Sequence, residues 1–464
     1  MLIYKFVHIR MARRTAFKSS YRLSGLDFQG GSSEGFVCSC FVYDSGGSFY
    51  IMGRNIKVGI GFATGRKNFE KVLKTYVYSW QECGLTDLEE VSLNLFVAYD
   101  LKYKNTKRKD YTISTQDVFH LIDDATFIGR NTIQSEISHL IEENVIDANE
   151  ARLLFGNGYA AKRNAALYFA IKSNMDYLLF LDDDEYPIAV TKTRDNVIWG
   201  GQQVLLTHLK NIRQADITHG HHCGYISPIP YIHFNDVMTE GDFRLFIEAI
   251  SNDIVNWDSI RAVMNNGGVT YADTKVLTSD IAEEVQETNH AKFISGGNLC
   301  INVTDPGRTI PFYNPPGARG EDTFLSTCLS DRKVLRVPCY AFHDGFSTYR
   351  HLMNGVLPNR LKYIEANSEK IVMRFYHACI GWVRYKPLLL YITQRDRYDE
   401  KISEMKANLT VSLPKVCDFF QCADFMNVLA ELEKFDKNVE KHYRQFINSQ
   451  NAWTRITGHF AENR

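Results

Sequence analysis

The chain has 464 residues, which is enough for one large domain or up to about three ordinary ones. Its composition is 45% apolar and 23% charged, with 25 Tyr and 29 Phe, and this excludes a disordered, low-complexity or collagen-like chain. The 53 basic and 54 acidic residues give a formal net charge of -1. Because no overall positive field is present to hold a polyanion, we expect no nucleic acid partner.

The amino end differs from the rest of the chain. Seven basic and three acidic residues give residues 1–54 a charge of +4, and Gly and Ser clusters at 30–33 and 45–48 separate short apolar pieces. We predict an N-terminal arm that is either disordered or non-native. No secretory signal and no run of about 18 apolar residues is visible, so we expect a cytoplasmic protein with no transmembrane segment. The ten cysteines, which include no CxxC pair, fit a reducing compartment.

From residue 56 onward, short apolar runs alternate with longer amphipathic ones, which is typical of strands separated by helices. The first strands are predicted at 56–62, 92–98 and 177–181, and the first helices at 68–80, 134–143 and 160–173. The third strand is apolar on both faces and is therefore expected to be buried. The pattern predicts an α/β fold with a mostly parallel sheet flanked by helices.

Further along the chain we predict helices at 196–213, 243–257, 281–286 and 322–329, and strands at 221–226 and within 293–301. Residues 356–464 carry helical patterns at 360–376 and 423–446, with Pro387 and Pro414 as expected breaks. The sequence thus divides into the arm of 1–54, an α/β domain of 55–355, and a helical C-terminal region of 356–464 that covers the sheet.

The sharpest chemical signal is the run LDDDEYP at 181–187, where the predicted buried strand ends. Successive carboxylates raise one another's pKa unless a cation neutralises them, and hard divalent ions bind such clusters of oxygen atoms. Alternate residues of an extended segment point the same way, so Asp182 and Asp184 can hold one ion while Asp183 points elsewhere. The alternative is a solvated acidic turn.

Four segments together resemble the GT-A glycosyltransferases, in particular the inverting family-two type. They are GNGYAAKRNAALYFAIKSNMDYLLFLDDDEYP at 156–187, FISGGNLCI at 293–301, GARGEDTFL at 317–325 and AFHDG at 341–345. Their order and spacing match that family's Asp-x-Asp motif, its Gly-Gly-Asn segment, its Glu-Asp motif and its late His. The resemblance covers roughly residues 56–350 and implies a GT-A-like fold.

The resemblance implies a hexosyltransferase-type enzyme that uses a divalent metal. Asp182, Asp184 and His343 would hold the metal against the diphosphate of a nucleotide-sugar, and a His ligand favours Mn²⁺ over Mg²⁺. Asp322 would be the catalytic base that takes the proton of the acceptor hydroxyl, with Glu321 beside it. Direct attack would then invert the anomeric centre; retaining enzymes share the metal motif.

The resemblance also assigns residues to substrate binding. Thr64, Arg66 and Asp100 follow predicted strands and correspond in position to nucleoside contacts, where ligands of such sheets bind. The family's usual Pro-Thr-x-Asn-Arg wording is absent, so the nucleotide base stays open between a UDP- and a GDP-linked donor. The other assigned residues are Lys162, Arg163, Asn164, Asp183, Gly296, Gly297 and Asn298; their alternatives are a solvated helix start for 162–164 and a plain turn for 296–297.

The acceptor is expected to be a hydroxyl of a glycan, a lipid or a small molecule. The Gln-x-x-Arg-Trp motif of processive synthases is missing, with TYRHL at 348–352 in the nearest position, so we expect transfer of single sugars. The aromatic and basic segment 371–392 could contact a membrane surface peripherally, line an acceptor groove or cover the core. His219, His221, His222 and Cys223 suggest either a second metal site or, preferably, an acceptor-site role.

Two other functions are carried as alternatives. The segment VGIGFATG at 58–65 is also typical of Rossmann-type enzymes that use NAD or S-adenosylmethionine. Such a site has an acidic residue about 20 positions later, at the end of the second strand, but here that strand ends near Asp100, some 35 residues beyond Gly65. A non-catalytic sugar-binding protein on the same fold is the other alternative, since fold does not dictate function.

Overall fold

The computed structural model describes residues 40–43, 49–52, 55–67, 69–85, 90–114, 118, 120–251 and 257–462. The chain divides into two compact units, Met1–Gly53 and Arg54–Arg464. In the first unit, β1 (Cys40–Tyr43) pairs with β2 (Phe49–Met52) in an antiparallel hairpin. The rest of the predicted arm lies outside the described residues.

The second unit is built around one large mixed sheet. Its strands are β3 (Ile56–Thr64), β4 (Val91–Tyr99), β5 (Asp124–Ile128), β6 (Tyr177–Leu181), β7 (Glu185–Tyr186), β10 (Ile217–Gly224), β11 (Glu283–Glu284), β12 (Leu299–Asn302) and β13 (Val334–His343). The order across the sheet is β11-β13-β10-β12-β6-β3-β4-β5, with β7 pairing β13. The prediction of an α/β fold is confirmed.

The sheet is mixed, so the prediction of a mostly parallel sheet is not confirmed. The pairs β3–β4, β3–β6, β4–β5 and β10–β13 are parallel, whereas β12 is antiparallel to both of its neighbours and β7 and β11 are antiparallel to β13. Strand β12 is short, and a long segment separates it from β10. The chain therefore enters β12 from the opposite end of the neighbouring strands. Periodicity within one strand carries no information on its direction.

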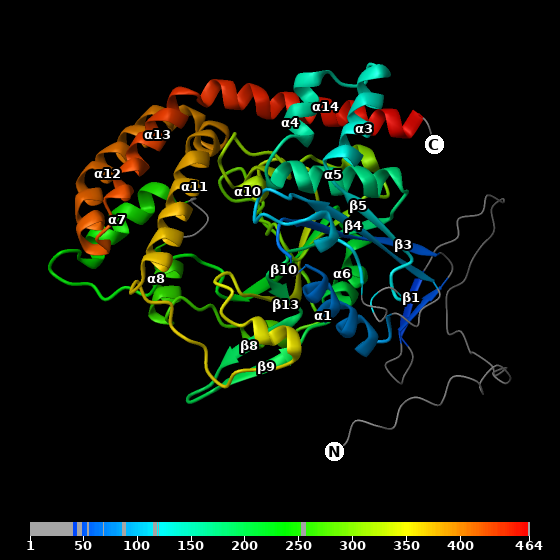
Figure 1. The fold of residues 1–464 in the computed structure, drawn as a ribbon, viewed down its shortest axis with the longest axis horizontal. Helices are drawn as coiled ribbons and strands as arrows, with labels where there is room; N and C mark the ends of the chain where they lie inside the picture. The colour runs from blue at the N-terminus through cyan, green and yellow to red at the C-terminus, as the bar shows by residue number, and fades with distance from the viewer. Residues whose placement is uncertain are drawn as a thin grey trace, which may run out of the picture. The chain divides into compact units, whose positions relative to one another are not determined.

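The second unit contains helices along its whole length. They are α1 (Phe69–Glu82), α3 (Arg130–Glu142), α4 (Ala148–Phe155), α5 (Tyr159–Lys172), α6 (Val204–Ile212), α7 (Glu240–Ile250), α8 (Trp257–Asn265), α9 (Thr274–Leu277), α10 (Glu321–Ser326), α11 (Glu369–Thr393), α12 (Tyr398–Phe420), α13 (Asn427–Lys437) and α14 (Val439–Glu462). Helices α11, α12 and α13 gather with α7 at one end, and α14 runs back past α4 (Figure 1). The helical C-terminal region is therefore present and packs on the α/β part.

Among the described residues of this unit, buried apolar side chains form at least two hydrophobic cores. The first lies between the sheet and α3, α4 and α5, and it includes Trp453 of α14. The second lies among α7, α8 and the C-terminal helices and is rich in aromatic rings such as Phe243 and Phe375. Strand β6 is completely buried along its length, as its apolar sequence predicts. Burying β6 fixes the position of the acidic residues that follow it.

Several local predictions are wrong, for local or for tertiary reasons. Residues 197–201 form strand β9 in a hairpin with β8 (Ile188–Lys192), and only 204–212 are helical, because Gly200 and Gly201 disfavour a helix. Residues 283–284 pair with β13 instead of forming a helix. Pro387 and Pro414 lie inside α11 and α12 instead of ending them. Burial of the surrounding helix faces outweighs one lost backbone hydrogen bond at each proline.

Two features of the described residues bear on earlier expectations. The helices seen in this part of the chain are all too short or too polar to cross a membrane. The cysteines of the second unit that the structure describes are free, with Cys223, Cys300, Cys339 and Cys379 buried.

Candidate functional site

The candidate site lies at the carboxyl ends of β3, β6 and β13. The chain leaves β3 to form β4 and β5 on one side, and then returns to place β6 on the other side of β3. Side chains beyond the carboxyl ends of strands at such a switch point face a natural crevice. Thr64 ends β3, Asp182 follows β6, and His343 ends β13. A backbone hydrogen bond of 2.9 Å from Asp344 to the carbonyl of Asp184 ties the last two segments together.

The three aspartates make different contacts. Asp182 accepts a hydrogen bond of 2.9 Å from Nη2 of Arg163. Asp183 accepts hydrogen bonds from the Thr64 hydroxyl and, at 2.8 Å, from Nη1 of Arg66. The same Arg66 nitrogen lies 2.5 Å from Oδ2 of Asp184. Asp183 and Asp184 therefore share Arg66, whereas Asp182 contacts Arg163. The alternation of an extended segment grouped Asp182 with Asp184 instead, and it does not hold here because residues 183–184 form a turn.

Burial raises the pKa of two of these carboxyl groups, whereas neighbouring cations lower the pKa of the third. Burial raises the pKa of Asp183 to about 6, against the lowering effect of Arg66. Burial also raises the pKa of Asp182, with Arg163 opposing and Glu185 adding to the rise. For Asp184 the effect of burial is outweighed, because His343 and Arg66 lower its pKa. Asp184 is thus the most firmly ionised member of the group.

His343 is oriented by a backbone contact. Its Nδ1 lies 2.9 Å from the carbonyl oxygen of Tyr225, so this nitrogen carries the hydrogen that it donates. Its Nε2 faces Oδ2 of Asp184 at 3.5 Å. Burial would lower the pKa of His343, but the charge of Asp184 raises it to about 9. A histidine whose Nδ1–H is held by a carbonyl presents Nε2 in the way metal-binding histidines do.

These residues fit a divalent ion, although the described residues contain no pre-assembled group of three or more metal-ligating side chains. The observation that carries the fit is the guanidinium of Arg66, a cation that bridges Asp183 and Asp184. A potential nitrogen ligand, Nε2 of His343, lies beside the Asp184 carboxylate. Oxygen and imidazole ligands together suit Mn²⁺.

Arg163 joins the acidic segment to α10. Its side chain is only 3% exposed, and it reaches Asp182 at 2.9 Å and Oε1 of Glu321 at 3.6 Å. Its guanidinium also lies 5.3 Å from the ring centre of Phe180. Nη1 has no hydrogen-bond partner among the described residues. Burial raises the pKa of Glu321, and Asp322 adds to the rise while Arg163 opposes it.

The Gly296–Gly297 backbone lies in the centre of these charged groups. A Cβ on Gly296 would be 3.2 Å from Nη2 of Arg163 and 3.4 Å from Oδ2 of Asp322. A Cβ on Gly297 would be 2.7 Å from both carboxylate oxygens of Glu185 and 2.9 Å from Asp182. Only glycine allows this close approach. Residues 296–297, for which a plain turn was the alternative to a site role, are therefore in direct contact with the acidic groups.

Glu185 and His222 belong to the site, although sequence analysis did not assign Glu185 to it and gave His222 to a different group. Oε1 of Glu185 lies 2.9 Å from Nε2 of His222, and Oε2 has no hydrogen-bond partner among the described residues. The Glu185 side chain is 5% exposed. Burial raises the pKa of the nearby Tyr76 phenol, and Glu185 and Asp182 raise it further. The fourth acid of the DDDE run was the only available signal for Glu185.

Two of the predicted substrate-binding residues are fully buried. Asn164 hydrogen-bonds the backbone of Leu154 and, through both its oxygen and its nitrogen, the backbone of Phe312. Asn298 accepts a hydrogen bond of 2.9 Å from the His208 ring and donates to the carbonyl of His221. Both amides fix loops behind the site, so we give them a structural role.

Lys162 and Asp100 lie at the β4 side of the site. The backbone nitrogen of Asp100 donates a hydrogen bond of 2.9 Å to the carbonyl of Thr64. Burial lowers the pKa of Lys162, and Asp100 opposes the lowering, so the two side chains are close in space. Asp100 and Thr64 therefore meet although 36 positions separate them, which the strand pattern allowed but did not fix.

Positive side chains gather outside the acidic segment, and sequence analysis assigned only Arg66 among them. We call them the cationic rim: Arg66, Lys104, Arg319 and Arg374. Burial would raise the pKa of the Tyr103 phenol, but a hydrogen bond with Tyr159 and the charges of this rim lower it. The Tyr103 and Tyr159 rings meet edge to face at 5.9 Å, and both are partly exposed. An exposed aromatic pair beside cations can accept a planar, phosphate-bearing ligand.

The histidines of β10 do not form the second metal site that was considered. His221 packs on Tyr340 with ring centres 5.0 Å apart, whereas His222 pairs with Glu185. His219 is 1% exposed, and burial lowers its pKa. Among the described residues, no group of three or more potential metal ligands includes these histidines. A role in acceptor binding stays a prediction.

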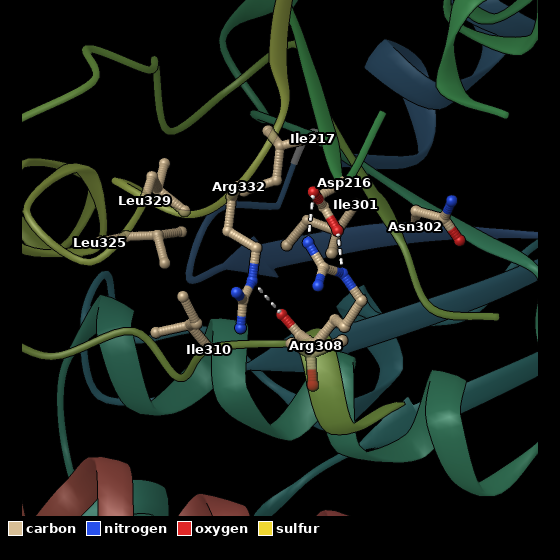
Figure 2. Close-up of a pocket in the computed structure, with 10 residues that line it drawn as sticks. Asp216, Ile217, Ile301, Asn302, Arg308, Ile310, Leu325, Leu329 and Arg332 are labelled. Carbon is tan, nitrogen blue, oxygen red and sulfur yellow. Dashed lines mark hydrogen bonds and ion pairs between the residues drawn. The ribbon is translucent and has the colours of Figure 1, made fainter. Parts of the chain in front are cut away.

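A separate, small cavity lies at the opposite edge of the sheet, by the start of β10 (Figure 2). Its volume is about 10 Å³, room for a single water molecule. Arg308 and Asp216 line it and face each other in a two-point contact, shown by the dashed lines in Figure 2. The cavity is too small for a substrate.

No family model matches this chain, and a search of curated proteins finds no match either. The functional argument therefore depends on the geometry of the residues described above.

Proposed function

We propose that this protein is a metal-dependent glycosyltransferase that moves a sugar from a UDP- or GDP-linked donor to a hydroxyl acceptor, inverting the anomeric centre. One observation carries the proposal. Asp182, Asp184 and His343 come from segments about 160 residues apart, and they meet with Arg66 and Arg163 at the carboxyl edge of the sheet. A cluster of carboxylates, imidazole and guanidinium groups is the equipment needed to bind a diphosphate.

The strand directions support a GT-A-like architecture. Strands β13, β10, β6, β3, β4 and β5 all run the same way once the two antiparallel contacts of β12 are combined. Their carboxyl ends therefore share one edge, where ligands of α/β sheets bind. The four segments that resemble this family contribute Arg163, Asp184, Gly297, Asp322 and His343, and the site contains all of them.

In this proposal, Asp184 and His343 hold the metal, with Asp182 beside them. When bound, the metal supplies Lewis-acid stabilisation of the charge that develops on the diphosphate leaving group. The chain's own residues bind and orient the donor. Arg66 and the rest of the cationic rim contact phosphate oxygens, and the tyrosine pair of Tyr103 and Tyr159 offers a surface for the nucleotide base.

Asp322 is proposed as the catalytic base. Its Oδ2 faces Gly296, so its carboxylate opens toward the segment that would line the donor sugar. Oδ1 accepts a hydrogen bond of 2.8 Å from the backbone of Thr323, which fixes the rotamer. Glu321 is held by Arg163 and is the less available of the two acids. A carboxylate placed in this way takes the proton of the acceptor hydroxyl as attack proceeds.

The test is ligand-dependent stabilisation followed by turnover. Thermal unfolding is measured with UDP, GDP, CMP, NAD and S-adenosylmethionine, each with and without Mn²⁺. Stabilisation by UDP or GDP that requires Mn²⁺ is the expected result. Stabilisation by NAD or S-adenosylmethionine without metal contradicts the proposal and favours the Rossmann-type alternative.

Hydrolysis of the nucleotide-sugar separates an enzyme from a sugar-binding protein. The wild-type protein should release nucleotide slowly from its own donor in the absence of acceptor. If bound donor is never turned over with any hydroxyl acceptor offered, the non-catalytic alternative is correct.

A further inference from the structure

The site has two halves of opposite charge. Around Asp183 and Asp184 lies the cationic rim, whereas around Gly296 and Gly297 lie four carboxyl groups. Those four are Asp182, Glu185, Glu321 and Asp322. Among the described residues, Arg163 is the guanidinium that reaches this acidic half, and its two closest contacts there are Asp182 and Glu321. The charge of Arg163 also acts on Asp322 and Glu185, but less strongly than on Asp182 and Glu321.

Glu185 is the residue that points to a ligand in the acidic half. It is more than nine-tenths buried, one oxygen pairs with His222 at 2.9 Å, and the other has no partner among the described residues. A buried carboxylate oxygen without a hydrogen bond is costly unless a ligand supplies a donor. Both oxygens pack directly against Gly297, where a Cβ would be 2.7 Å from each of them. A hydroxyl group delivered next to that glycine would satisfy the orphaned acceptor.

We infer that the acidic half binds the transferred sugar, that Glu185 selects a neutral, hydroxyl-rich hexose there, and that it rejects a uronate. This inference depends on the proposed function, since it concerns the sugar of the same donor. A sugar carboxylate would add a further negative charge beside Glu185, Asp182 and Asp322. Like charges in a buried site repel strongly, whereas hydroxyl groups donate hydrogen bonds to each carboxylate.

The cationic half binds the nucleotide diphosphate and not the sugar, so the nucleotide does not affect the preference between a hexose and a uronate. Two donors with the same nucleotide diphosphate make the same contacts with Arg66 and the rest of the rim. A comparison within one nucleotide therefore isolates the sugar. UDP-glucose and UDP-glucuronate differ only at carbon 6, as do GDP-mannose and GDP-mannuronate.

The experiment measures binding by calorimetry with Mn²⁺ present, first for UDP and GDP and then for the matched donor pair of whichever nucleotide binds. The hexose donor is expected to bind roughly tenfold or more tightly than the uronate donor. In Glu185→Gln the difference should shrink to within about threefold, because the amide keeps the shape and removes the charge. In Glu284→Gln, an exposed acid of β11, it should remain.

A second variant guards against a folding defect. His222→Gln removes the partner but leaves the Glu185 carboxylate in place, so it should keep the preference for the hexose donor. Equal affinity of the wild-type protein for both members of the pair overturns the inference while the proposed function stands. Failure of both nucleotides to bind overturns the proposed function itself.

Discussion

An arginine contacts an aspartate at each end of the parallel strands, and the two ion pairs differ in how completely their charges are satisfied. At the amino edge of β10, Arg308 contacts both oxygens of Asp216, at 2.5 and 2.9 Å, and the backbone nitrogen of Lys333 adds a hydrogen bond of 2.8 Å. At the carboxyl end of β6, Arg163 divides its contacts between Asp182 and Glu321, and its Nη1 has no hydrogen-bond partner in the described part of the chain.

The pKa values of the two aspartates are shifted in opposite directions. Burial opposes ionisation of Asp216, but the hydrogen bonds from Arg308 outweigh it and lower the pKa. At the other edge, burial and the neighbouring acids raise the pKa of Asp182 in spite of Arg163. The Arg308–Asp216 pair is complete by itself, whereas the carboxyl groups around Arg163 carry the raised pKa values that are common at functional sites. The predictions below test this difference.

The largest effect is expected from Asp322→Asn. If Asp322 takes the acceptor proton, donor turnover should fall by about 10²- to 10⁴-fold while the protein keeps its fold. Initial rates and the unfolding temperature are measured on the same preparation. Asp331→Asn, an acid that is 72% exposed, serves as the control and should leave the rate unchanged. A fall in rate of less than about threefold in Asp322→Asn assigns the proton transfer to another group.

Replacing the two arginines tests the comparison directly. Arg163→Met leaves two carboxyl groups in a buried environment without their counter-ion, and should lower the free energy of unfolding by about 3–5 kcal/mol. Arg308 is 45% exposed, so Arg308→Met should cost less than about 1 kcal/mol. Urea unfolding monitored by circular dichroism gives both values. Equal costs for the two variants would contradict the distinction between the edges.

The close approach of the Gly296–Gly297 backbone is tested by a single methyl group. In Gly297→Ala the new Cβ would lie 2.7 Å from the Glu185 oxygens, so we expect a loss of about 1–3 kcal/mol in stability and weaker donor binding. Gly200 of β9 has no atom within 4 Å of its Cβ position, which makes Gly200→Ala the matched control. The stabilities of both variants are measured from unfolding curves. If Gly297→Ala is as stable as the wild-type protein, Gly297 does not lie against Glu185.

A smaller loss of stability is expected when the pH is lowered, because of His208, whose ring hydrogen-bonds Asn298. His208 is fully buried, and its ring nitrogens contact Thr218 at 2.7 Å and Asn298 at 2.9 Å. Burial lowers its pKa to about 4. The unfolded chain takes up a proton below about pH 6.5 and the folded chain does not, so this group costs stability as the pH falls from 6.5 toward 4. Between pH 7 and pH 5 the loss should be about 1–2 kcal/mol.

The control for this pH dependence is a second histidine. His208→Gln should flatten the stability profile between pH 7 and pH 5, whereas His377→Gln, an exposed residue of α11, should leave it unchanged. Stability is taken from urea unfolding at each pH. A profile for His208→Gln that is as steep as that of the wild-type protein would show that other groups cause the acid sensitivity.

Most elements with a clear period were predictable from the sequence. The predicted strand 177–181 matches β6 residue for residue, and helix 160–173 matches α5 to within one residue, because continuous burial leaves a strong apolar pattern. Strands β5 and β13 were not predicted, since β5 is short and partly exposed and β13 carries Pro338 in its centre. The segment 281–286 was predicted as a helix because its pairing with β13 is a long-range contact.

For the site, the sequence by itself determined which residues carry charge and chemistry: the acids after β6, the paired glycines at 296–297, Asp322 and His343. These are chemical identities, and their local context is visible along the chain. Only the tertiary structure decided that Arg66 contacts Asp184, that His222 faces Glu185, and that Asn164 and Asn298 serve as internal supports. Such pairings depend on the order and direction of strands in the sheet, which join residues far apart in sequence and leave no periodic trace in it.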